Sequence, residues 1–161
     1  MILVAGVGNI FFGDDAFGSD VARRMIGRFE SPKARVIDFG IRALDLTYAL
    51  CDGYEAVIII DTFAQGGEPG TIYVVEPESN EFDNAPAMIE AHGMHVGHVL
   101  AAARSMGAPL ANVWIVGCEP QTFGPDEGKM GLSSPVAASV EPAIQVVESL
   151  IDKLLLKEAI V

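Results

Sequence analysis

The sequence predicts an α/β domain, a three-layer sandwich in which a twisted, mostly parallel sheet of about five strands carries helices on both faces. Short apolar runs alternate with helical stretches, as in strands joined by crossover helices. The run at 56–60, Ala-Val-Ile-Ile-Ile, is unbroken, which is typical of a central parallel strand covered on both faces. Because neither a repeat nor a linker divides the chain, we expect residues 1–161 to form a single domain.

Five segments are expected as strands because they are short apolar runs bounded by turn residues. These segments are residues 2–5, 34–38, 56–60, 70–76 and 113–116. Four segments are expected as helices from apolar positions that recur every three or four residues. They are residues 15–29, 42–50, 94–106 and a last helix that carries an apolar stripe from 136 to 154.

Local signals refine two of these helices. The last one begins at Ser134 and Pro135, a capping residue followed by proline at the first helical position. In the helix at 42–50, we expect Ala43 and Leu44 to face inward and Asp45 to face outward.

Two long loops are expected at 77–91 and 117–133. Loops of more than about 12 residues are uncommon in so compact a chain and tend to be functional. Their length and position predict that a substrate docks across 77–91 and 119–131.

Composition excludes several classes of function. The formal net charge of −12 argues against binding to nucleic acid or to an anionic membrane, and it favours solubility or a basic partner. No apolar run reaches the length that spans a bilayer, and the N-terminus reads as a strand rather than a leader, so we expect a cytoplasmic protein with no membrane insertion. Cys51 and Cys118 form neither a disulfide scaffold nor a Cys-x-x-Cys zinc site.

Residues with reactive or ligating side chains follow several of the predicted strands, and ligands of parallel sheets bind at the carboxyl ends of the strands. These residues are Asn9, Asp14 and Asp15 after the first strand, Asp61 after the third, His92 before the third helix, and Cys118 and Glu119 after the last strand. One imidazole and two carboxylates would make a mixed site suited to Zn, Ni, Fe(II), Mn or Co.

Each of these residues also has a structural interpretation. Asp14 and Asp15 could cap a helix, and Asp61 could fix a loop. His95 and His98 are one helical turn apart and compete with His92 as ligands. Cys118 could be a nucleophile or a buried apolar thiol.

Nucleotide binding is a further alternative, suggested by a Gly-x-Gly turn at 6–8. The dinucleotide fingerprint needs a third glycine, and Phe11 or Phe12 stands there instead. The two aspartates at the start of the next helix would also repel phosphate.

Six stretches taken together resemble the hydrogenase maturation protease family. They are residues 2–9, 13–18, 38–40 with Leu44, 57–61, 91–94, and 117–120 with 131–133. The resemblance covers nearly the whole chain. It implies an endopeptidase that removes a C-terminal extension from the precursor of a [NiFe] hydrogenase large subunit after nickel insertion.

The resemblance also implies a metal site formed by Asp15, Asp61 and His92, whose ligands reach nickel held by the substrate; another divalent metal is an alternative. Asp15 stands where some relatives carry glutamate, and Ala16 replaces a common glycine. Two mechanisms remain open. In one, a metal polarises the scissile carbonyl while Asp15 or Asp61 activates water; in the other, the enzyme is an aspartic-type peptidase without its own metal.

Two further functions fit the same residues. One is a peptidase or hydrolase of this fold that acts on another protein. The other is a non-catalytic module that binds a nickel-loaded partner.

Overall fold

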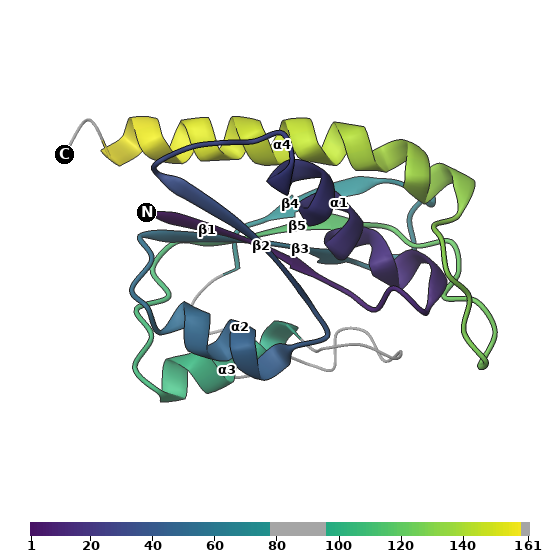
Figure 1. The fold of residues 1–161 in the computed structure, drawn as a ribbon, viewed down its shortest axis with the longest axis horizontal. Coiled ribbons are helices and arrows are strands. Elements are labelled where there is room, and N and C mark those ends of the chain that lie inside the picture. The colour runs from purple at the N-terminus through teal and green to yellow at the C-terminus, as the bar shows by residue number, and fades with distance from the viewer. Residues whose placement is uncertain (78–95, 159–161) are drawn as a thin grey trace.

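The computed structural model, which describes residues 1–77 and 96–158, is a three-layer α/β sandwich (Figure 1) and confirms the predicted fold class. Its five-stranded sheet has the order β2-β1-β3-β5-β4. The strands are β1 (Ile2–Val7), β2 (Ala34–Gly40), β3 (Ala56–Thr62), β4 (Ile72–Val75) and β5 (Val113–Cys118). The pairs of β1, β2, β3 and β5 are parallel, whereas β4 at one edge is antiparallel to β5.

Helices cover both faces of the sheet (Figure 1). They are α1 (Phe17–Ile26), α2 (Ala43–Leu50), α3 (Val96–Ser105) and α4 (Ser134–Glu158), with a short 3₁₀ turn, η1 (Gly13–Ala16), before α1. Helices α1 and α4 lie on one face, and α2 and α3 lie on the other. In the part of the chain that the structure describes, no helix has both the length and the apolarity to cross a bilayer.

Alternate residues of the central strands enter two separate cores. In β3, Ile58 and Ile60 pack on the α1 and α4 side, whereas Val57 and Ile59 pack on the α2 and α3 side. All four are at most 4% exposed, so both faces of the strand are dry. This explains why the sequence of β3 is apolar throughout.

Three expectations about the helices and strands differ from the structure. The helix expected at 15–29 is divided into η1 and the shorter α1, and the strand expected at 70–76 is confined to Ile72–Val75. The inward orientation of Leu44 is wrong, because its side chain is 64% exposed. The buried stripe of α2 runs through Leu46 and Leu50, and Leu44 lies two residues from Leu46, on another side of the helix.

Helix α1 lies unusually close to the carboxyl ends of β1 and β3. A Cβ on Gly18 would stand 2.0 Å from the carbonyl oxygen of Ile60 and 2.3 Å from that of Val7. A Cβ on Gly6 would stand 2.4 Å from the Cβ of Ala22. The absence of side chains at these two glycines therefore brings the start of α1, and η1 before it, over the ends of β1 and β3.

We expect Gly18→Ala to lower the free energy of unfolding by about 3 kcal/mol or more, because the new methyl group meets two backbone carbonyls that cannot move independently. Gly27→Ala is the matched control, since a Cβ there meets nothing within 4 Å. Urea denaturation of the two variants measures the difference. Equal stability of both would show that α1 does not depend on this close approach.

Candidate active site

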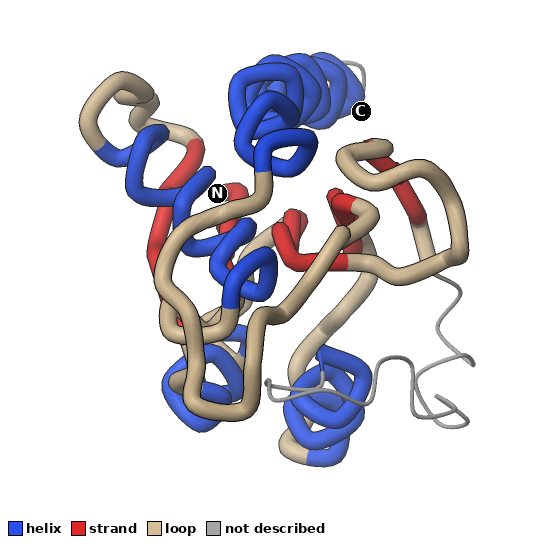
Figure 2. Tube along the Cα trace, turned by 90° about the vertical axis from the view of Figure 1, so that its right-hand side faces the viewer, coloured by secondary structure: helices blue, strands red, loops and turns tan. Residues whose placement is uncertain are grey.

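The carboxyl ends of β1 and β3 place two acidic side chains at one edge of the sheet, which faces the viewer in Figure 2. Asp15 belongs to η1, which follows β1, and Asp61 is the next-to-last residue of β3. Because β1 and β3 are neighbouring parallel strands, the chain segments that follow them emerge side by side.

Asp15 is 4% exposed and its carboxylate is held from two sides. The backbone N–H of Asn9 donates a hydrogen bond to Oδ2 at 3.0 Å, and the Thr62 hydroxyl lies 3.5 Å from Oδ1. Gly8 makes this turn possible, because a Cβ there would stand 1.9 Å from the Asp15 carbonyl oxygen. The turn after β1 therefore fixes the position of the Asp15 carboxylate.

Asp61 is partly buried and accepts a 2.7 Å hydrogen bond from the backbone N–H of Thr62. Burial raises the pKa of Asp61 well above its usual range, and the negative charge of Asp15 raises it further, although the bond from Thr62 acts in the opposite direction. A carboxyl group with a raised pKa next to a second carboxylate is a common feature of sites that exchange protons or bind cations.

The pair of carboxylates is chemically suited to a divalent metal ion, whose charge would offset the repulsion between Asp15 and Asp61. Two ligands do not complete such a site, and within residues 1–77 and 96–158 no group of three His, Cys, Asp or Glu side chains is arranged around one point. His92, the expected third ligand, and its rival His95 lie outside the described residues. His98 is exposed in the first turn of α3.

Asp14 is fully buried and has a different function from its neighbour. Its carboxylate accepts hydrogen bonds from the backbone N–H groups of Gln121, Thr122 and Ser133 and from the Ser133 hydroxyl, at 2.7 to 3.0 Å. These bonds fasten both ends of the loop at 117–133 to η1. Sequence reasoning gave Asp14 a capping role and did not identify this long-range contact, for which a single sequence carries no signal.

Glu119 is also a structural anchor. Its carboxylate accepts hydrogen bonds from the backbone N–H groups of Gln65 and Gly66, at 2.7 and 3.1 Å, and from the Tyr73 hydroxyl at 2.9 Å. Although desolvation acts to raise the pKa of Glu119, these donors outweigh it and lower the pKa. Glu119 therefore holds the turn between β3 and β4 as a carboxylate. It does not form part of a site with Asp15 and Asp61.

Cys118 is completely buried at the end of β5. Burial, together with the charge of Asp14, raises the pKa of the thiol to about 12. A thiol with such a pKa is protonated at neutral pH, and the thiolate is the nucleophilic form. Of the two interpretations of Cys118, the structure supports the buried apolar thiol.

Known proteins give a consistent family assignment for a chain with this fold and site. The family model described as hydrogenase maturation protease matches residues 20–150, a match that begins just after Asp15. The hydrogenase expression/formation protein HupD of Rhizobium leguminosarum is 32% identical over 154 residues, which cover 92% of this chain and 74% of that protein. The hydrogenase 2 maturation protease of Escherichia coli is 28% identical over 149 residues, with 89% and 86% covered.

A solved structure agrees with these relatives. The hydrogenase maturating endopeptidase HybD from Escherichia coli superimposes with a TM-score of 0.80 at 26% identity, and the match covers 94% of this chain and 92% of that one. The fold is thus that of an α/β peptidase. The chain belongs to the hydrogenase maturation protease family.

We expect Asp14→Asn to lower the free energy of unfolding by about 3 kcal/mol, because an amide NH₂ replaces one acceptor oxygen and leaves buried donors without partners. Asp52→Asn, at an exposed position, is the control and should stay within about 0.5 kcal/mol of the unaltered chain. Urea denaturation gives both values. A loss below 1 kcal/mol for Asp14→Asn would contradict the anchoring role.

The two cysteines should differ in reactivity. At pH 8 we expect a thiol-specific disulfide reagent to modify Cys51, which is partly exposed, and to leave Cys118 unmodified until the chain unfolds. The Cys51→Ser variant should then show no fast reaction in the native state. Rapid modification of Cys118 in that variant would restore the thiol as a candidate nucleophile.

Proposed function

We propose that the chain is the endopeptidase that removes a C-terminal extension from the nickel-loaded precursor of a [NiFe] hydrogenase large subunit. The observation that carries the proposal is the pair Asp15 and Asp61, with its raised pKa at Asp61, in a chain of the hydrogenase maturation protease family. The relatives' names support a hydrogenase as the source of the substrate.

In this proposal the nickel ion belongs to the substrate and serves as a recognition element. Asp15 and Asp61 provide two oxygen ligands, and His92 provides an imidazole nitrogen. Bound there, the metal supplies positive charge next to the peptide bond that is cleaved. A precursor without nickel would bring no charge to offset the repulsion between the two carboxylates, so it would bind less tightly.

The carboxylates also supply a base for hydrolysis. We assign this role to Asp61, which accepts the proton on the carboxylate oxygen that does not bind the metal. It takes a proton from a water molecule as the water oxygen attacks the scissile carbonyl carbon. The proton then passes to the departing amide nitrogen as the C–N bond breaks, which regenerates the carboxylate.

Thr62 positions both carboxylates in this scheme. Its backbone N–H donates a hydrogen bond to Asp61 while its hydroxyl lies next to Asp15, and the residue is 3% exposed.

Both cysteines of the chain are free thiols, which supports a reaction in the reducing environment of the cytoplasm.

The test is to incubate the purified chain with a co-encoded large-subunit precursor, nickel-loaded or nickel-free, and to follow the precursor by intact mass. We expect a short C-terminal peptide to be lost only from the nickel-loaded form. Stoichiometric binding of the loaded precursor without a cleaved product would instead assign the chain a non-catalytic role.

We expect Asp61→Asn to abolish processing, with a loss of at least about 100-fold in rate, since the base is removed. The variant should not be less stable than the unaltered chain at pH 7. A group whose pKa is raised by folding costs stability above that pKa, so removal of the charge relieves a cost. Asp45→Asn, an exposed substitution, is the control, and an Asp61→Asn variant that processes at the normal rate would refute the assignment.

A further inference from the structure

The two edge strands of the sheet differ in how their outer sides are protected. At the β2 edge, Ser31 and Ala34 form an isolated bridge. The guanidinium of Arg42 donates a hydrogen bond to the carbonyl of Asp38, and the side chain of Arg35 is exposed. A covering turn and exposed charges are common devices by which a protein keeps an edge strand from pairing with another chain. The β2 edge is therefore protected against the addition of a further strand.

The outer side of β4 has no such protection. The carbonyl of Thr71 faces β5, because it accepts a 2.9 Å hydrogen bond from the N–H of Glu119. Since backbone groups alternate in direction along an antiparallel strand, the N–H and C=O groups of Ile72 and Val74 point away from β5. No described residue forms a hydrogen bond with these outward groups. The strand itself holds neither proline nor lysine and shows no bulge.

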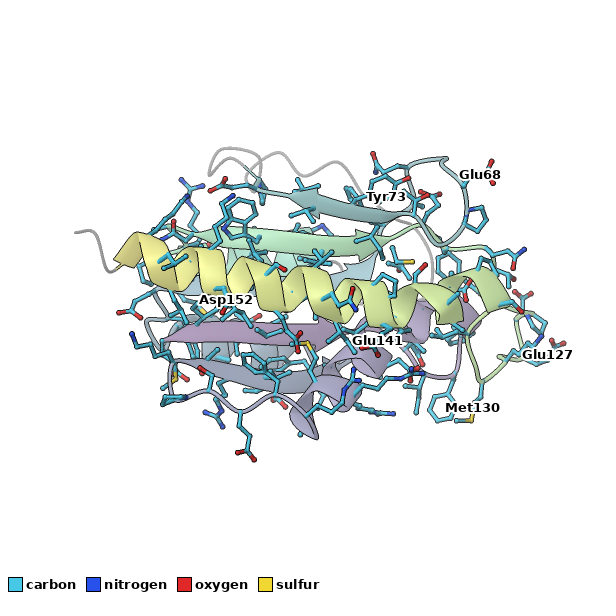
Figure 3. The ribbon with its side chains drawn as sticks, turned by 90° about the horizontal axis from the view of Figure 1, so that it is seen from above. Glu68, Tyr73, Glu127, Met130, Glu141 and Asp152 are labelled. Carbon is cyan, nitrogen blue, oxygen red and sulfur yellow. The ribbon has the colours of Figure 1, made fainter. Side chains whose placement is uncertain are left out.

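We call the outward backbone groups of Ile72 and Val74, together with the Val74 side chain, the β4 edge. The side chain of Val74 is 47% exposed, although it is apolar. In Figure 3, β4 with Tyr73 forms one border of the sheet. A β-branched side chain on an open strand packs well against the side chains of a neighbouring strand. The β4 edge therefore offers both backbone pairing and an apolar contact to an added strand.

The charges at the two ends of β4 indicate the chemistry of such a strand. Glu76 directly follows β4 and Glu68 lies in the turn before it (Figure 3), and both are exposed. Neither forms an ion pair with another described residue. The sequence holds no lysine or arginine between Arg42 and Arg104, and Lys153 on α4 lies over an aromatic ring of β5. A strand that carries basic side chains near its ends would complement the two glutamates.

We infer that the β4 edge binds an extended, basic segment of another polypeptide, which adds to the five-stranded sheet as a further strand. The backbone of the segment pairs with Ile72 and Val74, and one of its apolar side chains covers Val74. Its basic side chains lie against Glu68 and Glu76. A second copy of the chain is disfavoured, since two β4 edges would bring acidic side chains together.

This surface is separate from the carboxylate pair. Because β5 lies between β4 and β3, an added strand would run three strand spacings, roughly 14 Å, from β3. The inference therefore goes beyond the proposed reaction and does not depend on it.

The test follows the whole chain, labelled with nitrogen-15, by NMR while a blocked peptide of sequence Lys-Val-Thr-Val-Thr-Lys is added. We expect saturable shifts of the amide signals of Ile72 and Val74, whose N–H groups gain acceptors. The signals of Tyr73 and Val75 should shift less, because their N–H groups already face β5. Absence of saturable shifts at Ile72 and Val74 would overturn the inference.

Two altered peptides separate strand pairing from other contacts. A peptide that is N-methylated at every central residue keeps its side chains and charge but cannot pair, so we expect it to bind at least about tenfold more weakly. A peptide with glutamate in place of both lysines should also bind at least about tenfold more weakly at low salt. Equal binding of the methylated peptide would refute strand addition, and equal binding of the acidic peptide would refute a basic partner.

Val74→Lys and Leu156→Lys are a matched pair, because each adds one positive charge at an exposed apolar residue, and Leu156 lies near the end of α4. We expect Val74→Lys to weaken binding of the lysine peptide about tenfold, since lysine on an edge strand opposes pairing. Leu156→Lys should leave the affinity unchanged, and equal affinities of the two variants would contradict the inference. If sedimentation shows self-association of the chain that Val74→Lys abolishes, the edge belongs to a second copy and the inference fails.

A second comparison tests the charge. We expect the double variant Glu68→Gln/Glu76→Gln to lower the affinity for the lysine peptide about threefold at low salt and to reduce its dependence on NaCl concentration. The control Asp45→Asn/Asp52→Asn removes the same two charges from exposed positions on α2 and directly after it. Equal salt dependence of the two double variants would contradict basic side chains at the β4 edge.

Discussion

The repulsion between Asp15 and Asp61 is the constraint around which this end of the molecule is built. Two neighbouring parallel strands deliver the carboxylates to one edge of the sheet, and burial together with Asp15 raises the pKa of Asp61. Such an arrangement costs folding free energy at neutral pH unless a proton or a cation is present. The close approach of α1 at Gly18 and the turn at Gly8 hold the two carboxylates in place. The stability of the rest of the fold compensates for the free-energy cost of their repulsion.

The adjacent residues Asp14 and Asp15 have different roles in the structure. The Asp14 carboxylate accepts hydrogen bonds from four donors of the loop at 117–133 and therefore has a structural role. The Asp15 carboxylate instead lies next to the Thr62 hydroxyl and acts through its charge on Asp61. The same short turn therefore fixes the Asp15 carboxylate and the loop beside it. A change in the loop at 117–133 would act on Asp14 directly and on Asp15 through its neighbour Asp14.

Three features could be predicted from the sequence because each depends on a local pattern. They are the alternation of strands and helices, the burial of β3, and the acidic residues that follow β1 and β3. The orientation of Leu44 could not, since a helix of eight residues allows more than one apolar side and its packing partner selects between them. The roles of Asp14 and Glu119 depend on donors more than 40 positions away in the chain, so no local pattern reveals them. His92 as the third ligand stays a prediction, because it lies outside the described residues.

The most direct test of this account is the pKa of the Asp61 carboxyl group, followed by carbon-13 NMR in metal-free protein, with and without Asp15→Asn. The account predicts a pKa well above the usual value in the unaltered chain. In Asp15→Asn it predicts a lower pKa that remains above that usual value, because the neighbouring charge is gone while burial persists. An Asp61 pKa that is ordinary, or that does not respond to Asp15→Asn, would show that the two carboxylates do not act as a pair.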